Sequence, residues 1–112
     1  NKTFDIETTT INFPLNSTAP IDRYIIELEG VMDSLKINNM VLNNIDGRFK
    51  IDLYNRLVYK INIDGTIENR LLDFNKDWDH IDYKQNNYTV NLEVTNLTSQ
   101  NKITFFFTNT FL

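Results

Sequence analysis

Hydrophobic and polar residues alternate with a period of two along much of this chain, and no segment sustains an apolar face at helical spacing. Residues 88–94 show the pattern most clearly, because every second residue from Tyr88 to Val94 is apolar and those between are polar. This alternation is typical of a strand with one face against the core. The chain is therefore predicted to be a β protein.

Five segments are predicted as clear strands and three as weaker ones. The clear strands are 24–29, 49–53, 57–63, 88–94 and 103–108, and the weaker ones are 4–8, 35–38 and 67–72. Pro14 and Pro20 enclose an early loop, and the polar stretch 73–87 is expected to be a long connection with a short helical turn after Phe74. About eight short strands separated by turns favour an all-β, antiparallel β-sandwich or jelly roll.

The length of 112 residues predicts a single domain spanning residues 1–112. Such a chain buries roughly two-thirds of the surface that its unfolded form exposes, and it is too short for a second core. Residues 1–20 are expected to be a linker or the first strand. Because the chain does not begin with Met, we expect it to be a piece of a longer protein.

The parity of apolar residues predicts the register of a first hairpin. A three-residue loop, 54–56, would create one continuous apolar face, whereas a two-residue loop would not. The three-residue loop sets these apolar pairs opposite each other: Leu53 with Leu57, Ile51 with Tyr59, and Phe49 with Ile61.

A second hairpin is predicted around Gly65. A loop of residues 63–65, with Gly65 in the left-handed conformation after a type I turn, sets Ile61 opposite Ile67 and Leu57 opposite Leu71. A tight Asp64-Gly65 loop would set Ile61 opposite Glu68 instead. The two hairpins together predict a three-strand meander whose apolar face belongs to the core. The members of that face are Phe49, Ile51, Leu57, Tyr59, Ile61, Ile67 and Leu71.

Charge and composition exclude several classes of function. The formal net charge is −4, which argues against unassisted binding to nucleic acid or to an anionic membrane. Without cysteine, the chain has no disulfide, thiolate nucleophile or cysteine-ligated metal. No apolar run has the length that a bilayer requires. We therefore predict neither membrane insertion nor a cofactor.

The acidic stretch after Leu72 is the only candidate for a metal site. Oxygen and imidazole ligands are dense there, as Ca²⁺ would require, but the glycine and the closing glutamate of an EF-hand loop are missing. A solvated acidic loop is the favoured interpretation, so no metal site and no catalytic residue is predicted. Asp77 and Asp79 would be the pair for glycoside hydrolysis, but their spacing in a loop does not indicate it. The candidate metal ligands in this acidic stretch are Asp73, Asp77, Asp79, His80 and Asp82.

Aromatic residues offer a second kind of site, a sugar-stacking platform. Tyr59, Tyr88, Phe105 and Phe107 are expected to face the core. Phe106 has the opposite parity, so it would be exposed in a one-faced sheet or would contact another protein. Trp78 is expected to cap the edge of the core. The predicted residues for contact with a partner or a glycan are Trp78, Asp79, His80, Tyr83 and Phe106.

The order of short motifs in the centre of the chain resembles a known family. Phe-Lys-Ile-Asp at 49–52 is followed by Val-Tyr-Lys-Ile at 58–61, Asp-Gly at 64–65, Asn-Arg at 69–70 and Phe-Asn-Lys-Asp-Trp at 74–78. This order is similar to the C-terminal domain of siphophage distal tail proteins. The segments 24–30 and 103–107 resemble that family's first and closing strands, so the resemblance covers about residues 20–112.

The resemblance implies a galectin-like β-sandwich in a virion component at the tail tip, encoded by a phage or prophage. The expected partners are other tail and baseplate proteins, with a host-surface glycan as a further candidate. Ring assembly would depend on an N-terminal half outside this sequence, and the isolated fragment is expected to be a monomer. The alternative prediction is a carbohydrate-binding module that recognises a host cell-wall or exopolysaccharide glycan.

Overall fold

The computed structural model describes residues 2–6, 10–14, 24–78, 83–84, 87–98 and 101–107. Almost all of the elements in this part of the chain are strands, which confirms the predicted all-β class. The strands are β1 (Lys2–Asp5), β2 (Thr10–Pro14), β3 (Tyr24–Ile37), β4 (Met40–Asp52), β5 (Leu57–Ile61), β6 (Ile67–Asn69), β7 (Tyr83–Lys84), β8 (Asn87–Thr95) and β9 (Lys102–Phe107), and Leu71–Asp73 forms a 3-10 helix, η1.

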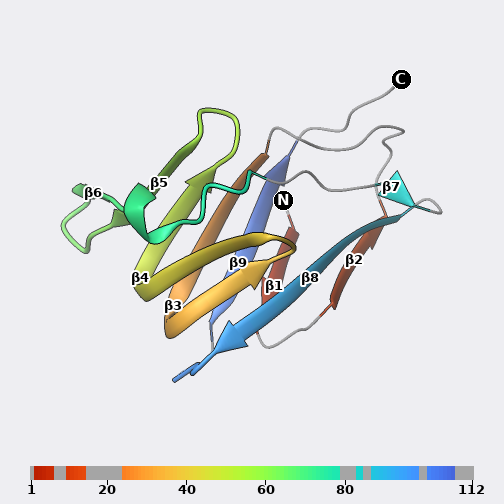
Figure 1. Cartoon of the computed structure of the whole chain (residues 1–112), viewed down its shortest axis with the longest axis horizontal. Coiled ribbons are helices and arrows are strands. Elements are labelled where there is room, and N and C mark those ends of the chain that lie inside the picture. Colours follow the sequence, from red (N-terminus) through yellow and green to blue (C-terminus); the bar gives the residue numbers. More distant parts are fainter. Residues whose placement is uncertain are drawn as a thin grey trace.

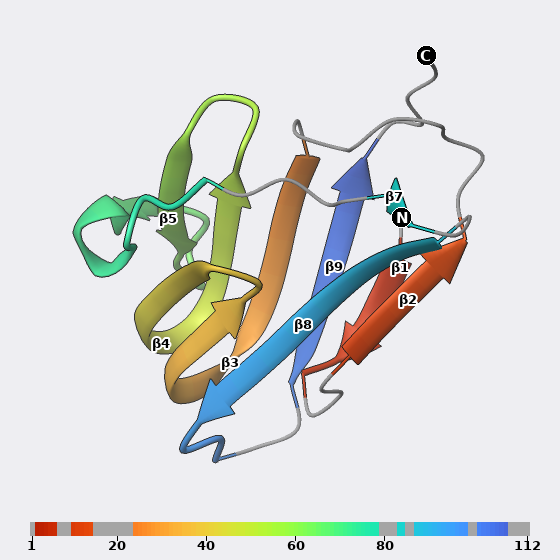
Figure 2. The ribbon, with the colours of Figure 1, turned by 45° about the vertical axis from the view of Figure 1, so that its right-hand side comes forward.

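The strands form two antiparallel layers that share β3 and β4. The larger layer has the order β1-β9-β3-β4-β5-β6, and in the second layer β8 pairs with β2, β7 and the end of β3. Figure 1 shows the long β3–β4 hairpin curling from one layer into the other, and Figure 2 shows β8 and β2 in front of β9 and β1. This arrangement confirms the predicted antiparallel β-sandwich.

The bend in the β3–β4 hairpin reverses which residues face the core. In β3 the buried residues are even-numbered as far as Met32 and odd-numbered from Leu35 onwards. In β4 they change from even numbers at Leu42 to odd numbers at Ile45. Asn44, at the change in β4, has a positive φ of 57°, a conformation that asparagine tolerates better than most residues. One hairpin can therefore supply apolar side chains to both layers.

The core lies between the two layers and consists almost entirely of aliphatic and phenylalanine side chains. Phe49 and Phe105 are its largest members, and both are completely buried. Val90 and Leu92 face the core, as predicted, and Val94 packs against the same core. The buried apolar residues are Ile6, Ile26, Leu28, Met32, Leu35, Ile37, Met40, Leu42, Ile45, Phe49, Ile51, Leu53, Val58, Phe74, Val90, Leu92, Ile103 and Phe105.

Several predicted boundaries are wrong. The separate strands expected at 24–29 and 35–38 are the two ends of β3, and β4 begins nine residues before the predicted Phe49. The strand expected at 67–72 ends at Asn69, and the short helical turn precedes Phe74 rather than following it. Within the first 20 residues, β1 pairs with β9 and β2 with β8. Residues 15–20, and most of the predicted connection after Trp78, lie outside the described residues.

The predicted register of the first hairpin is also wrong. Asp52 stands opposite Leu57, and Ile51 stands opposite Val58, so the loop has four residues rather than three. This shift of one residue places Val58 in the core, whereas Leu57 is 48 % exposed. Tyr59 and Ile61 turn outward together with Leu57, because side chains alternate along a strand. The apolar face predicted for the core is therefore split between the two sides of the sheet.

Turn chemistry explains the four-residue loop. The carboxylate of Asp52 accepts hydrogen bonds from the backbone N–H of Asn55 at 2.9 Å and from its side-chain amide at 3.0 Å. An aspartate that bonds the backbone of a following residue is a common stabiliser of turns. Arg56 closes the loop with a positive φ of 56°, and Leu53 remains buried within it. These contacts hold the four-residue loop, which leaves Leu57 exposed.

The second hairpin has the predicted register. Ile61 stands opposite Ile67, and Gly65 has a φ of 88°. The backbone N–H of Gly65 donates to the carbonyl of Asn62 at 2.9 Å, and the N–H of Asn62 donates to the carbonyl of Thr66 at 2.8 Å. Both backbone groups of Asn62 thus close the loop of residues 63–65, through bonds to Gly65 and Thr66.

Candidate interaction surface

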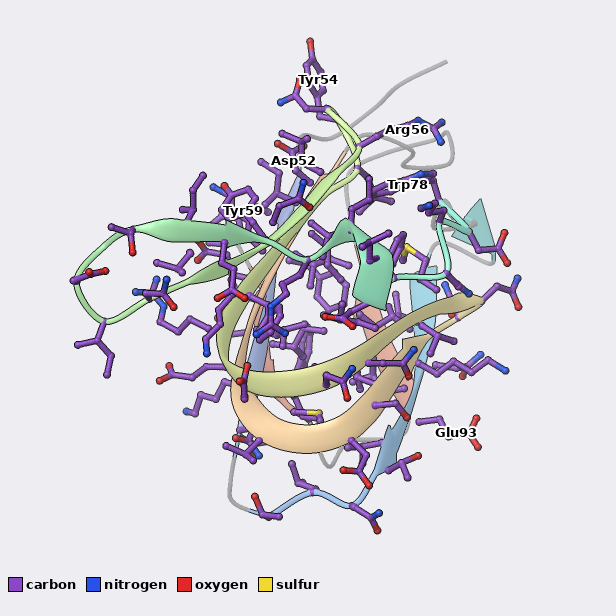
Figure 3. All side chains as sticks on the ribbon, turned by 60° about the vertical axis from the view of Figure 1, so that its left-hand side comes forward. Asp52, Tyr54, Arg56, Tyr59, Trp78 and Glu93 are labelled. Atoms are coloured by element: carbon purple, nitrogen blue, oxygen red, sulfur yellow. The ribbon has the colours of Figure 1, made fainter. Side chains whose placement is uncertain are left out.

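Trp78 is the predicted contact residue that the structure describes most fully. Its ring is half-buried and packs against Phe74, with 4.8 Å between ring centroids. The guanidinium carbon of Arg56 lies 5.6 Å from the centroid of the Trp78 ring, within the range of a cation–π contact. Figure 3 shows Arg56 and Trp78 near the loop that carries Tyr54. Trp78 therefore caps the edge of the core, as the sequence predicts.

Of the other predicted contact residues, Phe106 is the one whose side chain the structure describes. Phe106 is half-buried on β9, opposite Ile25 of β3, on the outer side of the larger layer. The side chain of Phe106 faces outward, as predicted, and its neighbour Phe105 is buried, also as predicted. The backbone of Tyr83 belongs to β7, but its side chain lies outside the described residues, as do Asp79 and His80.

The outer face of the larger layer carries charges of opposite sign on neighbouring strands. Glu29 of β3 stands opposite Arg48 of β4 on one side and opposite Lys102 of β9 on the other. In the next row, Glu27 stands opposite Lys50. Opposite charges that face each other across strands stabilise a sheet modestly. The sequence alone did not reveal this surface, because the pairs appear only once the register of three strands is known.

A hollow lies beside these rows, where β4 and β5 approach the second hairpin. Its volume is about 840 Å³, within the range of ligand pockets in general. A Cβ at Gly47 would lie 3.4 Å from Cε of Lys60, so a residue with a side chain at this position would narrow the hollow. The apolar residues of the lining are Ile61 and Ile63. Its polar side chains are those of Glu29, Asp46, Arg48, Lys60, Asn62 and Asp64.

Charges in the hollow are nearly balanced, which restricts the ligands that it suits. The ammonium of Lys60 lies 3.2 Å from a carboxylate oxygen of Asp46. The hydroxyl and the backbone N–H of Thr66 donate to Asp64, at 2.6 Å and 3.0 Å. The hydroxyl bond is the larger cause of the lowered pKa of Asp64, and the backbone bond adds to it. Because Lys60 is already paired and Asp64 already accepts two hydrogen bonds, the hollow offers hydrogen bonds to hydroxyl groups rather than a strong field for an ion.

Arg70 organises a second cluster of charges, on the inner side of β6. Its guanidinium lies 3.0 Å from Glu68, 3.2 Å from Asp73 and 3.4 Å from Asp46, and its carbon lies 5.2 Å from the Phe49 ring centroid. Burial opposes the charge, but hydrogen bonding to Glu68 and the neighbouring carboxylates together raise the pKa of Arg70 above its ordinary value. This cluster covers the edge of the core and ties β4, β6 and η1 together.

The acidic stretch does not form a metal site in the part that is described. Asp73 receives hydrogen bonds from Arg70 and from the side-chain amide of Asn44, at 3.2 Å and 3.1 Å. Within residues 2–6, 10–14, 24–78, 83–84, 87–98 and 101–107, no three His, Cys, Asp or Glu side chains converge as metal ligands. Asp73 therefore acts as an ion-pair partner in the fold.

No family model, curated protein or solved structure matches this chain. Among the residues that the structure describes, no helix has the length and apolar character needed to cross a bilayer.

Proposed function

We propose that this chain is a non-catalytic interaction domain of a phage tail tip, the C-terminal part of a distal tail protein. The observation that carries the proposal is the order of motifs in residues 49–78, which resembles that family. These residues form the end of β4, the two hairpins around β5 and the segment that ends at Trp78. The domain acts by presenting a rigid sheet face and loops to neighbouring baseplate proteins.

Rigidity of the framework supports this role. Asp52 fixes the loop of the first hairpin, and Arg70 joins three elements at the edge of the sheet. A virion component must hold its contacts without turnover, and ordered strands present side chains more precisely than mobile loops do. The paired charges on the outer face provide orientation for a partner without a large net field.

Immunogold labelling of purified virions tests this proposal. Antibodies raised against the chain are expected to label the tail tip, and they should also slow adsorption of the phage to its host. An antiserum against the major capsid protein is the matched control, because it should label heads only. Virions that lack the label at the tip, while the capsid control succeeds, would contradict the proposal.

A second candidate is glycan binding, and the hollow beside β4 and β5 favours it. Arginine, lysine, asparagine and carboxylate side chains there can exchange hydrogen bonds with the hydroxyl groups of a neutral sugar. A glycan array of cell-wall and exopolysaccharide fragments tests this function, with and without EDTA. Arg48→Ala should abolish a genuine signal, whereas Lys36→Ala on the other layer should not.

A further inference from the structure

We propose that the free edge of β6 pairs with β6 of a second copy of this chain, antiparallel and about a two-fold axis at Ile67. This interface goes beyond the proposed function, and it differs from the monomer that the sequence predicts. Within the described part of the chain, β6 is the last strand of the larger layer and pairs only with β5. Its other edge is available for a strand.

Hydrogen bonding to β5 shows which backbone groups face that edge. The carbonyl of Thr66 accepts from Asn62, and the N–H of Arg70 donates to the carbonyl of Val58 at 2.9 Å. Thr66 and Arg70 therefore turn their backbone groups toward β5. In an antiparallel pair alternate residues turn the opposite way, so Ile67 and Asn69 direct their N–H and C=O groups outward. A second antiparallel strand centred on Ile67 can bond to both backbone groups of that residue.

One side chain on this edge, Ile67, is apolar although it is exposed, whereas its neighbours Glu68 and Asn69 are polar. Ile67 is 65 % exposed beside its cross-strand partner Ile61, and Ile63 in the adjoining loop is fully exposed. Natural proteins usually protect a free strand edge with charged residues or proline. With Ile67 opposite its copy, the isoleucines 61 and 67 of both chains form one continuous row on the outer face.

The same register is favourable for the charged residues. Counting outward from Ile67, Thr66 faces Glu68 of the second copy, and the turn residue Asp64 approaches its Arg70. Glu68 already binds Arg70 of its own chain at 3.0 Å, which lessens the repulsion between two acidic chains at this edge. A register centred on Glu68 would place two carboxylates opposite each other, which is unfavourable.

The opposite edge of the larger layer lacks these features. There β1 presents Thr3 and Asp5 to solvent, and Thr3 hydrogen-bonds through its hydroxyl to Thr104 at 2.9 Å. Because β6 has only three residues, the proposed contact is small, and we expect a reversible dimer at high concentration.

Sedimentation equilibrium of the chain, up to about 1 mM, tests for this dimer, since weak contacts have millimolar dissociation constants. The average mass of the wild type should rise toward twice that of the monomer. Ile67→Lys should raise the dissociation constant about tenfold or more, because it places like charges on the axis. Leu72→Lys, at a residue that is 94 % exposed but outside β6, should change it less than about twofold.

Cross-linking locates the contact, and the absence of native cysteine makes it specific. Ile67→Cys should form covalent dimers with a short bismaleimide, because opposed Cα atoms in such a pair are about 5.5 Å apart. Thr3→Cys on β1 is the matched control and should remain monomeric. Circular dichroism must show each variant folded. A chain that stays monomeric at the highest concentration, or that cross-links no better through residue 67 than through residue 3, would overturn the proposal.

Discussion

The centre of the larger layer and its β5–β6 end have similar alternating sequences but opposite burial. At the centre, Leu28 and Phe49 are at most 2 % exposed. At the β5–β6 end, Ile67 is 65 % exposed although it also occupies a regular position in a strand. The direction of the side chains accounts for the difference. Leu28 and Phe49 point toward the second layer, which covers the centre (Figure 2), whereas Ile67 lies in the outward-facing row of Ile61 and Arg48.

This contrast shows that alternation indicates the two faces of a strand but not whether either face is covered. Val58 and Leu57 are adjacent aliphatic residues in one strand, yet only Val58 enters the core. Apolar side chains left outside are then available for contact with another molecule, as we propose for β6. Four measurements test the distinction between the covered centre and the uncovered end.

The largest effect is expected for a truncation at the centre. Phe49→Ala should lower the free energy of unfolding by about 3–5 kcal/mol, because it leaves a cavity and removes the ring beneath Arg70. Ile67→Ala, at the uncovered end, should cost less than about 0.5 kcal/mol. Urea denaturation of dilute, monomeric protein measures both. Similar costs at the two positions would show that the contrast in burial is wrong.

A smaller but still large effect is expected at Gly30. A Cβ there would lie 2.4 Å from Cγ of the buried Asn101 side chain, and 2.6 Å from Cε of Met32. Gly30→Ala should therefore destabilise the fold by about 1–3 kcal/mol through overpacking. The cost should fall when Asn101 is also shortened to alanine, and a double-mutant cycle measures that coupling. Additive costs would contradict a direct clash.

At the uncovered end, Gly65 should be sensitive through its backbone alone. No atom lies within 4 Å of the position where its Cβ would be, but its φ of 88° disfavours a branched side chain. Gly65→Val should cost about 1–3 kcal/mol, and Gly65→Asn should cost less, because asparagine tolerates positive φ. Thermal unfolding compares the two. A valine variant that melts at the wild-type temperature would refute the left-handed turn.

The smallest effect concerns Asp64, whose carboxylate is exposed. Hydrogen bonds from Thr66 lower its pKa below the ordinary 3.8, so this carboxylate contributes stability above pH 3.8 and loses it as the pH falls through the lowered value. Thr66→Ala should move the pKa of Asp64 back toward 3.8, whereas Thr66→Ser should preserve it. Carbon-detected NMR titration of the carboxyl group measures the shift. An unchanged pKa in the alanine variant would exclude the hydroxyl as its main cause.

Much of the fold could be predicted from local signals. Alternation located the clear strands, including the inward residues Val90 and Leu92, and Gly65 indicated the register of the second hairpin. Of the predicted contact residues, Trp78 packs at the edge of the core as expected, and Phe106 has the outward parity that the sequence assigned to it. Arg48 and Glu29 were missed as surface residues because their proximity depends on pairing between strands.

Residue preferences over a few neighbours are sufficient to predict the all-β class and the turn at Gly65. Three other features could be recognised only in the folded structure. The hairpin of β3 and β4 bends from one layer into the other, with Asn44 at the change in β4, and Asp52 closes a four-residue loop. Ile67 lies on the exposed outer face. The physical reason is that burial depends on which segments distant in the chain cover a strand. A shift of one residue in a loop then reverses the face of every side chain that follows.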